Sequence, residues 1–250
     1  GQGQTVFSKA GVDIDDVIRD AQRQPIGIVY YEGGELKNEY FDPASQKINA
    51  QLAAAFPGSN IMVMDKDKSG DYSLIYVDSS TNPGSVFLFD LKTKSVEKID
   101  DNAPWLAKVK FGTSKTIKVT ARDGLLIESY LAMPPSSEKA PPLIVMPHGG
   151  PIGIRDDRHF DHSVQFLVSL GYAVLQVNFR GSEGFGKSFR EAGKGSLGTA
   201  IEDDVDAVLT EVLKTQTVDK NNMCIMGMSY GGYSALVSSM RWPGRFKCAI

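Results

Sequence analysis

The stretch CIMGMSYGGYSAL, residues 224–236, decides how the rest of the chain is interpreted. An apolar run precedes Ser229, small residues follow it, and Gly227 and Gly231 flank it in the pattern Gly-x-Ser-x-Gly. Between a strand and a helix, this pattern places the serine on a sharp, strained turn that exposes its hydroxyl above a sheet. Glycine is needed two residues before and after the serine because the backbone comes close to its neighbours there. We therefore predict a nucleophile elbow at Ser229, in preference to a glycine-lined turn with an idle serine.

Apolar strands alternate with helical segments on both sides of this motif. The runs LIVMP (143–147) and YAVLQVNF (172–179) are separated by an amphipathic segment at 162–171, and a second such segment covers 201–215. This alternation is typical of a mostly parallel sheet with helices on both faces, so the sequence predicts a doubly wound α/β fold. The acids at 202–206 crowd the start of the second helix, where the helix dipole favours them, and we prefer that explanation to a catalytic role.

The part of the chain before residue 113 has a different pattern. From Ile26 to Ile99, short β-like runs alternate with turn clusters, as in consecutive antiparallel strands. The stretch 85–99 resembles the last two strands of a propeller blade, and we expect one to two blades. Residues 65–71, DKDKSGD, imitate the start of a calcium loop, but Tyr76 stands where a bidentate acid is needed. We predict a turn there and no metal site.

Composition excludes several classes of partner. The chain has 27 basic and 30 acidic residues and a net charge of −3, so it has no cationic surface for nucleic acid. No apolar run reaches the length of a membrane span, and no positively charged stretch leads into an apolar signal-like region in these residues. We expect a soluble protein, cytoplasmic or periplasmic, with no membrane partner, no metal and no cofactor. The sequence leaves the compartment and the formation of a homo-oligomer open.

The two cysteines, Cys224 and Cys248, lie in apolar, strand-like runs. A disulfide framework has more cysteines in a shorter chain, and a metal site has ligands at close spacing. We therefore expect two buried thiols rather than a disulfide.

Two backbone segments are candidates for an oxyanion hole. The N–H of Tyr230 lies at a predicted helix N-terminus, where it can donate to an anion. The turn HGGP (148–151) follows the first strand of the α/β part, the position from which hydrolases with this elbow donate a second hydrogen bond. We assign His148 and Gly149 to the oxyanion site, and prefer this to a purely structural turn role for His148.

Two other upstream features carry polar side chains. The glycine-rich loop NFRGSEGFG (178–186) follows a strand and carries Arg180, a candidate for substrate binding because ligands bind at the carboxyl ends of such strands. It lacks the glycine spacing and the lysine of a phosphate-binding loop. His159 and His162 lie three residues apart near a helix start, and we expect surface or capping roles rather than a metal pair.

Together these motifs resemble one family. The segments RDG (122–124), HGGP, NFRGSEGFG, EDDVDAV (202–208) and GMSYGGYSAL occur in an order and spacing similar to the prolyl oligopeptidase family of serine peptidases, especially its acylaminoacyl-peptidase and dipeptidyl-aminopeptidase-like branch. The resemblance covers about 115–250. It implies an α/β-hydrolase catalytic domain over 113–250, preceded by a partial β-propeller-like segment over 1–112.

The resemblance also implies a reaction. Members of the family hydrolyse short peptides through an acyl-enzyme, which would form here on Ser229. Tyr230 and the HGGP turn would complete the oxyanion hole, and Arg180 would help to shape the substrate cleft. Many relatives have tyrosine where this chain has Phe179, and we expect little effect from the missing hydroxyl.

The triad departs from the family pattern. In α/β-hydrolases an acid and a histidine follow the serine along the chain, but the 21 residues after Ser229 contain neither. All three histidines precede the serine. We therefore expect the chain to be a truncated part of a longer enzyme, with the triad Asp and His beyond residue 250 in the remainder of its own catalytic domain. This portion alone would be inactive, because triad members act as a unit.

Two alternatives share the same motifs. An esterase or lipase can carry the elbow and the HGG turn, although the propeller-like segment and the NFRGSEGFG loop favour the peptidase. A non-catalytic relative could keep the fold and bind ligands without the triad. The preference at the substrate's P1 position and the choice between exo- and endopeptidase action are not readable from the sequence.

Overall fold

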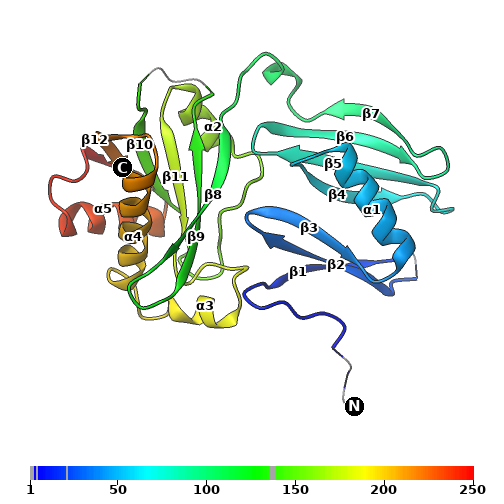
Figure 1. The fold of residues 1–250 in the computed structure, drawn as a ribbon, viewed down its shortest axis with the longest axis horizontal. Helices are drawn as coiled ribbons and strands as arrows, with labels where there is room; N and C mark the ends of the chain where they lie inside the picture. Colours follow the sequence, from blue (N-terminus) through cyan, green and yellow to red (C-terminus); the bar gives the residue numbers. More distant parts are fainter. Residues whose placement is uncertain (1–2, 4, 21, 136–138) are drawn as a thin grey trace.

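The computed structural model describes residue 3 and residues 5–20, 22–135 and 139–250. Figure 1 shows two parts side by side: two small antiparallel sheets with one helix, and a larger mixed sheet flanked by helices. The first part contains β1 (Ile14–Arg19), β2 (Pro25–Glu32), β3 (Glu35–Tyr40), α1 (Pro43–Ala55), β4 (Asn60–Lys66), β5 (Tyr72–Ser79), β6 (Asn82–Asp90) and β7 (Ser95–Asp101). A short 3-10 helix, η1 (Pro104–Leu106), leads into the second part.

The second part begins with a hairpin and continues as alternating strands and helices. Its elements are β8 (Thr113–Thr120), β9 (Leu126–Met133), β10 (Pro142–Pro147), α2 (His162–Ser169), β11 (Ala173–Asn178), α3 (Lys187–Ala192), α4 (Ala200–Thr215), β12 (Asp219–Ile225), α5 (Tyr230–Arg241) and β13 (Cys248–Ala249). Among the described residues, no helix has the length and apolar character needed to cross a membrane.

The first part is built from consecutive antiparallel strands, as its sequence pattern predicts. β1, β2 and β3 form one sheet, and β4 to β7 form a second in which each strand pairs with the next along the chain. Residues 67–71 form the turn between β4 and β5, and residues 65–66 of the predicted turn are the end of β4. The Asp67 carboxylate accepts a hydrogen bond from the Tyr72 N–H at 3.0 Å, as expected of an aspartate in a turn.

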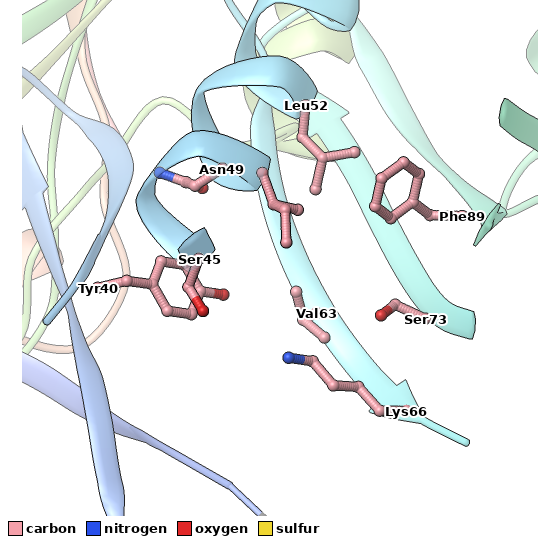
Figure 2. Close-up of a pocket in the computed structure, with 9 residues that line it drawn as sticks. Tyr40, Ser45, Asn49, Leu52, Val63, Lys66, Ser73 and Phe89 are labelled. Atoms are coloured by element: carbon pink, nitrogen blue, oxygen red, sulfur yellow. The ribbon is translucent and has the colours of Figure 1, made fainter. Parts of the chain in front are cut away.

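Helix α1 was not anticipated, because the sequence interpretation placed only strands and turns between Ile26 and Ile99. Asp42 caps the helix by accepting a hydrogen bond from the Ser45 N–H at 2.8 Å, and a proline occupies its first turn. Figure 2 shows Leu52 of this helix facing Phe89 of β6, beside a small cavity of about 40 Å³. The helix thus covers one face of the four-stranded sheet and buries a core of its own.

The mixed sheet has the order β13-β12-β10-β11-β9-β8. The four strands β13, β12, β10 and β11 run parallel, whereas β9 and β8 pair antiparallel at one edge. The β8–β9 hairpin turns at Asp123-Gly124, where Gly124 has φ +88°, and Asp-Gly is a typical pair at such a turn. The parallel arrangement places the ends of β10, β11 and β12 at one edge of the sheet.

Helices cover both faces of this sheet. The apolar stripe of α4, including Ile201, Val205 and Leu209, packs with α5 against one face, in a core that contains Leu175 and Val177 of β11. On the other face α2 packs through Val164 and Val168, in a smaller cluster. Burial of whole apolar side chains on both faces stabilises the sheet by about 1.5–3 kcal/mol per residue.

Polar contacts join the two parts through the segment that follows HGGP. The Arg158 N–H donates to the Gly34 carbonyl at 2.8 Å, and its guanidinium pairs with Glu35 at 2.9 Å. The guanidinium of Arg155 lies 3.5 Å from the ring centroid of Tyr31, a cation–π contact. The same loop that begins at the candidate oxyanion turn therefore also carries the contact with the first part.

His159 lies in this interface rather than on the surface, so the surface or capping role expected of it is wrong. Its Nδ1 is 2.6 Å from the Asp78 carboxylate, and its Nε2 is 2.7 Å from the Tyr31 hydroxyl. Burial acts to lower the pKa of His159, but the hydrogen bond to Asp78 and the nearby acids outweigh it and raise the pKa. His162, by contrast, begins α2 directly after its N-cap, Asp161, close to the helix start that the sequence predicts.

The expectation of two free thiols is also wrong. Cys224 and Cys248 form a disulfide, the strands β12 and β13 that carry them are hydrogen-bonded in parallel, and the two cysteines are register partners. Their Cα atoms are 4.8 Å apart, within the range that a disulfide spans. Counting cysteines in the sequence could not reveal this register, which brings together residues 24 positions apart.

Candidate active site

The predicted strand–turn–helix unit is present around Ser229. β12 ends at Ile225, and α5 begins at Tyr230, immediately after the serine. Ser229 has φ +58° and ψ −120°, a conformation that residues with a side chain rarely adopt and that costs about 1–3 kcal/mol. The residue is exposed, and its neighbour Met228 is 84% exposed. The turn therefore presents the serine to solvent under local strain, as a nucleophile elbow does.

Close backbone contacts explain the two glycines of the motif. A Cβ atom placed on Gly227 would lie 2.5 Å from the carbonyl carbon of Gly231. A Cβ on Gly231 would lie 2.2 Å from the carbonyl oxygen of Pro147, at the end of β10. Neither space can hold a methyl group without movement of the backbone. The prediction that these positions must lack side chains is confirmed.

The HGGP turn lies against the elbow. A Cβ on Gly149 would be 3.4 Å from the Met228 carbonyl oxygen and 3.7 Å from the Cβ of Ser229, so a side chain at this position would touch the elbow. The turn and the N-terminus of α5 thus meet at Ser229. The oxyanion roles of Tyr230, His148 and Gly149 remain predictions, and this arrangement is the one that they require.

The imidazole of His148 is held by the HGGP turn and the glycine-rich loop. Its Nδ1 lies 2.7 Å from the Gly149 carbonyl, which can only accept, so Nδ1 carries a proton. Its Nε2 lies 2.8 Å from the Ser182 hydroxyl, and its ring stacks on Phe179 with centroids 4.2 Å apart. Burial lowers the pKa of His148 to about 4, so the ring is neutral at pH 7 and can orient the turn but adds no positive charge.

This protonation state predicts a loss of stability in acid. An unfolded histidine titrates near pH 6.5, whereas folded His148 has a pKa of about 4. Between these values the unfolded chain binds a proton that the folded chain does not. The free energy of unfolding therefore falls as pH falls, by up to about 1.4 kcal/mol per pH unit from this group. Denaturant unfolding at several pH values, with His148→Gln as the reference, measures how much His148 contributes to the pH dependence of the free energy of unfolding. Equal pH slopes for the two proteins would contradict the assignment.

Arg180 is bound to acids rather than open to a ligand. Its Nε and Nη2 donate to the two carboxylate oxygens of Asp204, each at 2.8 Å, and its backbone N–H donates to the same group at 2.9 Å. Its Nη1 donates to Asp123 at 2.8 Å. Arg180 and Asp204 are 9% and 0% exposed. The substrate-binding role of Arg180 remains a prediction, and this geometry favours a role in fixing the loop to α4 and to the β8–β9 turn.

Two acids that the helix dipole seemed to explain have specific partners. Asp204 pairs with Arg180, and Glu202 accepts a hydrogen bond from the Tyr230 hydroxyl at 2.8 Å; both acids are fully buried. A signal for Asp204 was available, since it lies three residues after Ile201 and four before Val208, on the apolar stripe of the helix. Glu202 had the same signal, since it lies three residues before Val205 and seven before Leu209, but its partner on another helix could not be read from the sequence.

The histidines of the chain are engaged away from the serine hydroxyl. The partners of His148 are Ser182 and Gly149, and those of His159 include Asp78 and Tyr31. The His162 ring lies edge-on to Phe160, with centroids 5.0 Å apart.

A further cavity of about 830 Å³ is lined by residues of the first part, from Asp15 to Gly70, and does not include the elbow.

Comparison with known proteins places these features in a family. A profile described as the prolyl oligopeptidase family matches residues 158–250. Dipeptidyl aminopeptidase BIII of Pseudoxanthomonas mexicana is 28% identical over 100% of this chain, and the match spans 37% of that enzyme. Dipeptidyl peptidase family member 6 of Caenorhabditis elegans is 34% identical over 76% of this chain and 28% of its own length. The chain thus spans well under half the length of these curated relatives.

Solved structures show the same arrangement. The uncomplexed acylaminoacyl peptidase of Pyrococcus horikoshii superimposes with a TM-score of 0.69 at 21% identity, over 93% of this chain and 36% of its own. At this identity the likeness shows a shared fold.

Proposed function

The chain belongs to the prolyl oligopeptidase family, and on that premise we propose that the protein containing it is a serine peptidase that hydrolyses short peptides through an acyl-enzyme on Ser229. The observation that carries the proposal is the strained, exposed Ser229 in the turn between β12 and α5, with Gly149 of the HGGP turn beside it. Residues held in a strained backbone conformation cluster at active sites, where the surrounding structure enforces the strain.

The residues of this chain have defined parts in the proposed reaction. The Ser229 hydroxyl attacks the peptide carbonyl and loses its proton to a general base. The oxyanion that forms accepts hydrogen bonds from the Tyr230 N–H and from the backbone of the His148–Gly149 turn. Expulsion of the amine leaves an ester on Ser229, which water then hydrolyses.

The general base and its acid are proposed to come from outside residues 1–250. The three histidines of the chain have other partners, and His148 is held neutral between Gly149 and Ser182. In α/β-hydrolases the acid and the histidine follow the serine along the chain. The remainder of the catalytic domain would therefore be the partner that completes the triad.

The finer architecture is part of the same proposal. Residues 113–250 would be the first part of an α/β-hydrolase domain, and residues 1–112 a partial β-propeller. The change from small antiparallel sheets to the mixed sheet, which starts with β8 at Thr113, supports this boundary. A propeller in front of the site would exclude folded proteins and admit only short peptides. The names of the first two relatives refer to dipeptide release, which is compatible with this substrate class.

A comparison of two substrates and one probe tests the function. In the full-length protein, we expect turnover of an aminoacyl p-nitroanilide and labelling of Ser229 by a fluorophosphonate. Turnover of a p-nitrophenyl ester without any amidase activity would contradict the peptidase and support an esterase. An unlabelled Ser229 and no turnover of either substrate would support a non-catalytic relative.

A further inference from the structure

We infer that Glu202 is a positioning residue for the oxyanion site: through the Tyr230 hydroxyl it holds the Tyr230 backbone N–H against the reacting carbonyl at Ser229. The inference rests on the proposed function, since it concerns the same serine. It adds a residue from a different helix, α4, which touches neither the serine nor the HGGP turn in any contact described above.

The contact that carries the inference is a buried hydrogen bond between two helices. The Tyr230 hydroxyl donates to Glu202 Oε1 at 2.8 Å, with the tyrosine 7% and the glutamate 0% exposed. Tyr230 is the first residue of α5, so its N–H is one of those that have no acceptor within the helix. The side chain and the candidate oxyanion donor belong to the same residue. A shift of the phenol therefore moves the donor as well.

The buried side-chain carboxylate of Glu202 lowers the stability of the folded protein. Its second oxygen, Oε2, is buried and has no hydrogen-bond partner among the described residues. A buried carboxylate with one of its oxygens unpaired destabilises the fold relative to an apolar side chain of similar size. The helix does not need it for packing, because the α4 stripe is formed by residues such as Ile201 and Val205. A stability role alone does not account for Glu202.

The geometry makes Glu202 a firm anchor. Two residues further along α4, Asp204 is bound by three donors of Arg180, which ties the start of the helix to the loop after β11. On its other side Tyr230 packs near Phe179, with ring centroids 5.8 Å apart, and Phe179 stacks on His148. The loop after β11 thus contacts both sides of the candidate oxyanion site: Arg180 binds the start of α4, and Phe179 packs against Tyr230 and His148.

The phenol stays a donor at working pH. Burial, and after it the hydrogen bond and charge of Glu202, raise the pKa of Tyr230 far above its usual value. Since the phenol keeps its proton, the contact with Glu202 persists throughout the range in which a serine peptidase operates.

The expected kinetic signature follows from when the oxyanion exists. The negative oxygen is present in the transition state and not in the bound substrate, so a misplaced donor lowers kcat and leaves KM nearly unchanged. Loss of an entire oxyanion donor costs about 10²–10³ in kcat, so a displaced donor is expected to cost about 10- to 100-fold.

Variants of the full-length protein separate positioning from stability. Tyr230→Phe and Glu202→Leu each leave one partner unpaired, and we expect both to lower the melting temperature and kcat. The double variant Tyr230→Phe/Glu202→Leu replaces the polar pair by an apolar one, which should restore the melting temperature. Asp203→Asn is the matched control: the neighbouring acid pairs with Arg241 at the surface, and its loss should leave kcat unchanged.

The double variant decides the question. Recovered stability with kcat still about 10- to 100-fold below wild type, KM unchanged and slower fluorophosphonate labelling support positioning by Glu202. Recovery of kcat together with stability, or single variants with wild-type kcat, would overturn it. If the wild-type protein neither turns over substrate nor reacts with the probe, the proposed function itself is wrong and this inference falls with it.

Discussion

The full-length protein carrying Ser229→Ala is expected to lose peptide hydrolysis by about 10⁴-fold or more, with no labelling by a fluorophosphonate. The hydroxyl is the atom that attacks, and no other group in the elbow can replace it. Alanine keeps the Cβ and thus the strained backbone at φ +58°, so the melting temperature should change little. Kinetics with an aminoacyl p-nitroanilide and gel detection of the probe measure both results.

Two further variants make this result specific. Ser239→Ala removes a hydroxyl from the same helix, where it bonds to the Leu236 carbonyl at the surface, and should leave hydrolysis and labelling intact. Ser229→Gly should be as inactive as the alanine variant but more stable, by about 1 kcal/mol, because glycine accepts a positive φ without strain. Activity that survives in Ser229→Ala would assign the reaction to another residue.

Arg180→Ala is expected to lower the free energy of unfolding by about 3–5 kcal/mol, because it leaves Asp204 as an unpaired charge in the interior. Asp204 is fully buried and receives three hydrogen bonds from Arg180. Asp204→Asn weakens the same pair from the other side and should also destabilise. Denaturant unfolding of the full-length protein gives the size of each effect.

The same variants separate this structural role from the predicted substrate contact. Arg122→Ala, in the exposed β8–β9 turn, is the control and should change stability by no more than about 0.5 kcal/mol. If Arg180 instead serves substrate binding, Arg180→Ala will raise KM while unfolding remains as in wild type, and Asp204→Asn will not reproduce the effect. That pattern would contradict the network described here.

Local sequence was a sufficient guide to the elbow. The strand, the turn and the helix around Ser229 are consecutive, so glycine spacing and apolar periodicity predicted them without knowledge of distant residues. The β8–β9 hairpin was predictable for the same reason, from Asp123-Gly124 at its turn. Helix α1 shows the limit of this approach: its cap at Asp42 and proline in the first turn were readable signals, but the surrounding strand pattern obscured them.

Distant contacts were beyond the reach of such patterns. The disulfide depends on the register of β12 with β13, and the position of His159 depends on a loop meeting β5 at Asp78. The residues next to the cysteines do not encode the strand register, and those next to His159 do not encode its contact with Asp78. The expectations of free thiols and of a surface histidine, which rested on residue number and spacing along the chain, were therefore wrong.

The sequence by itself determined the candidate nucleophile and the class of fold, because both follow from short-range periodicity and from glycines that permit close backbone approach. Only the tertiary structure decided what each polar side chain does. Glu202 and Asp204 are two residues apart on one helix, yet one binds Tyr230 and the other Arg180. The physical reason is that the role of a buried charge depends on the group opposite it, and packing of separate elements chooses that group.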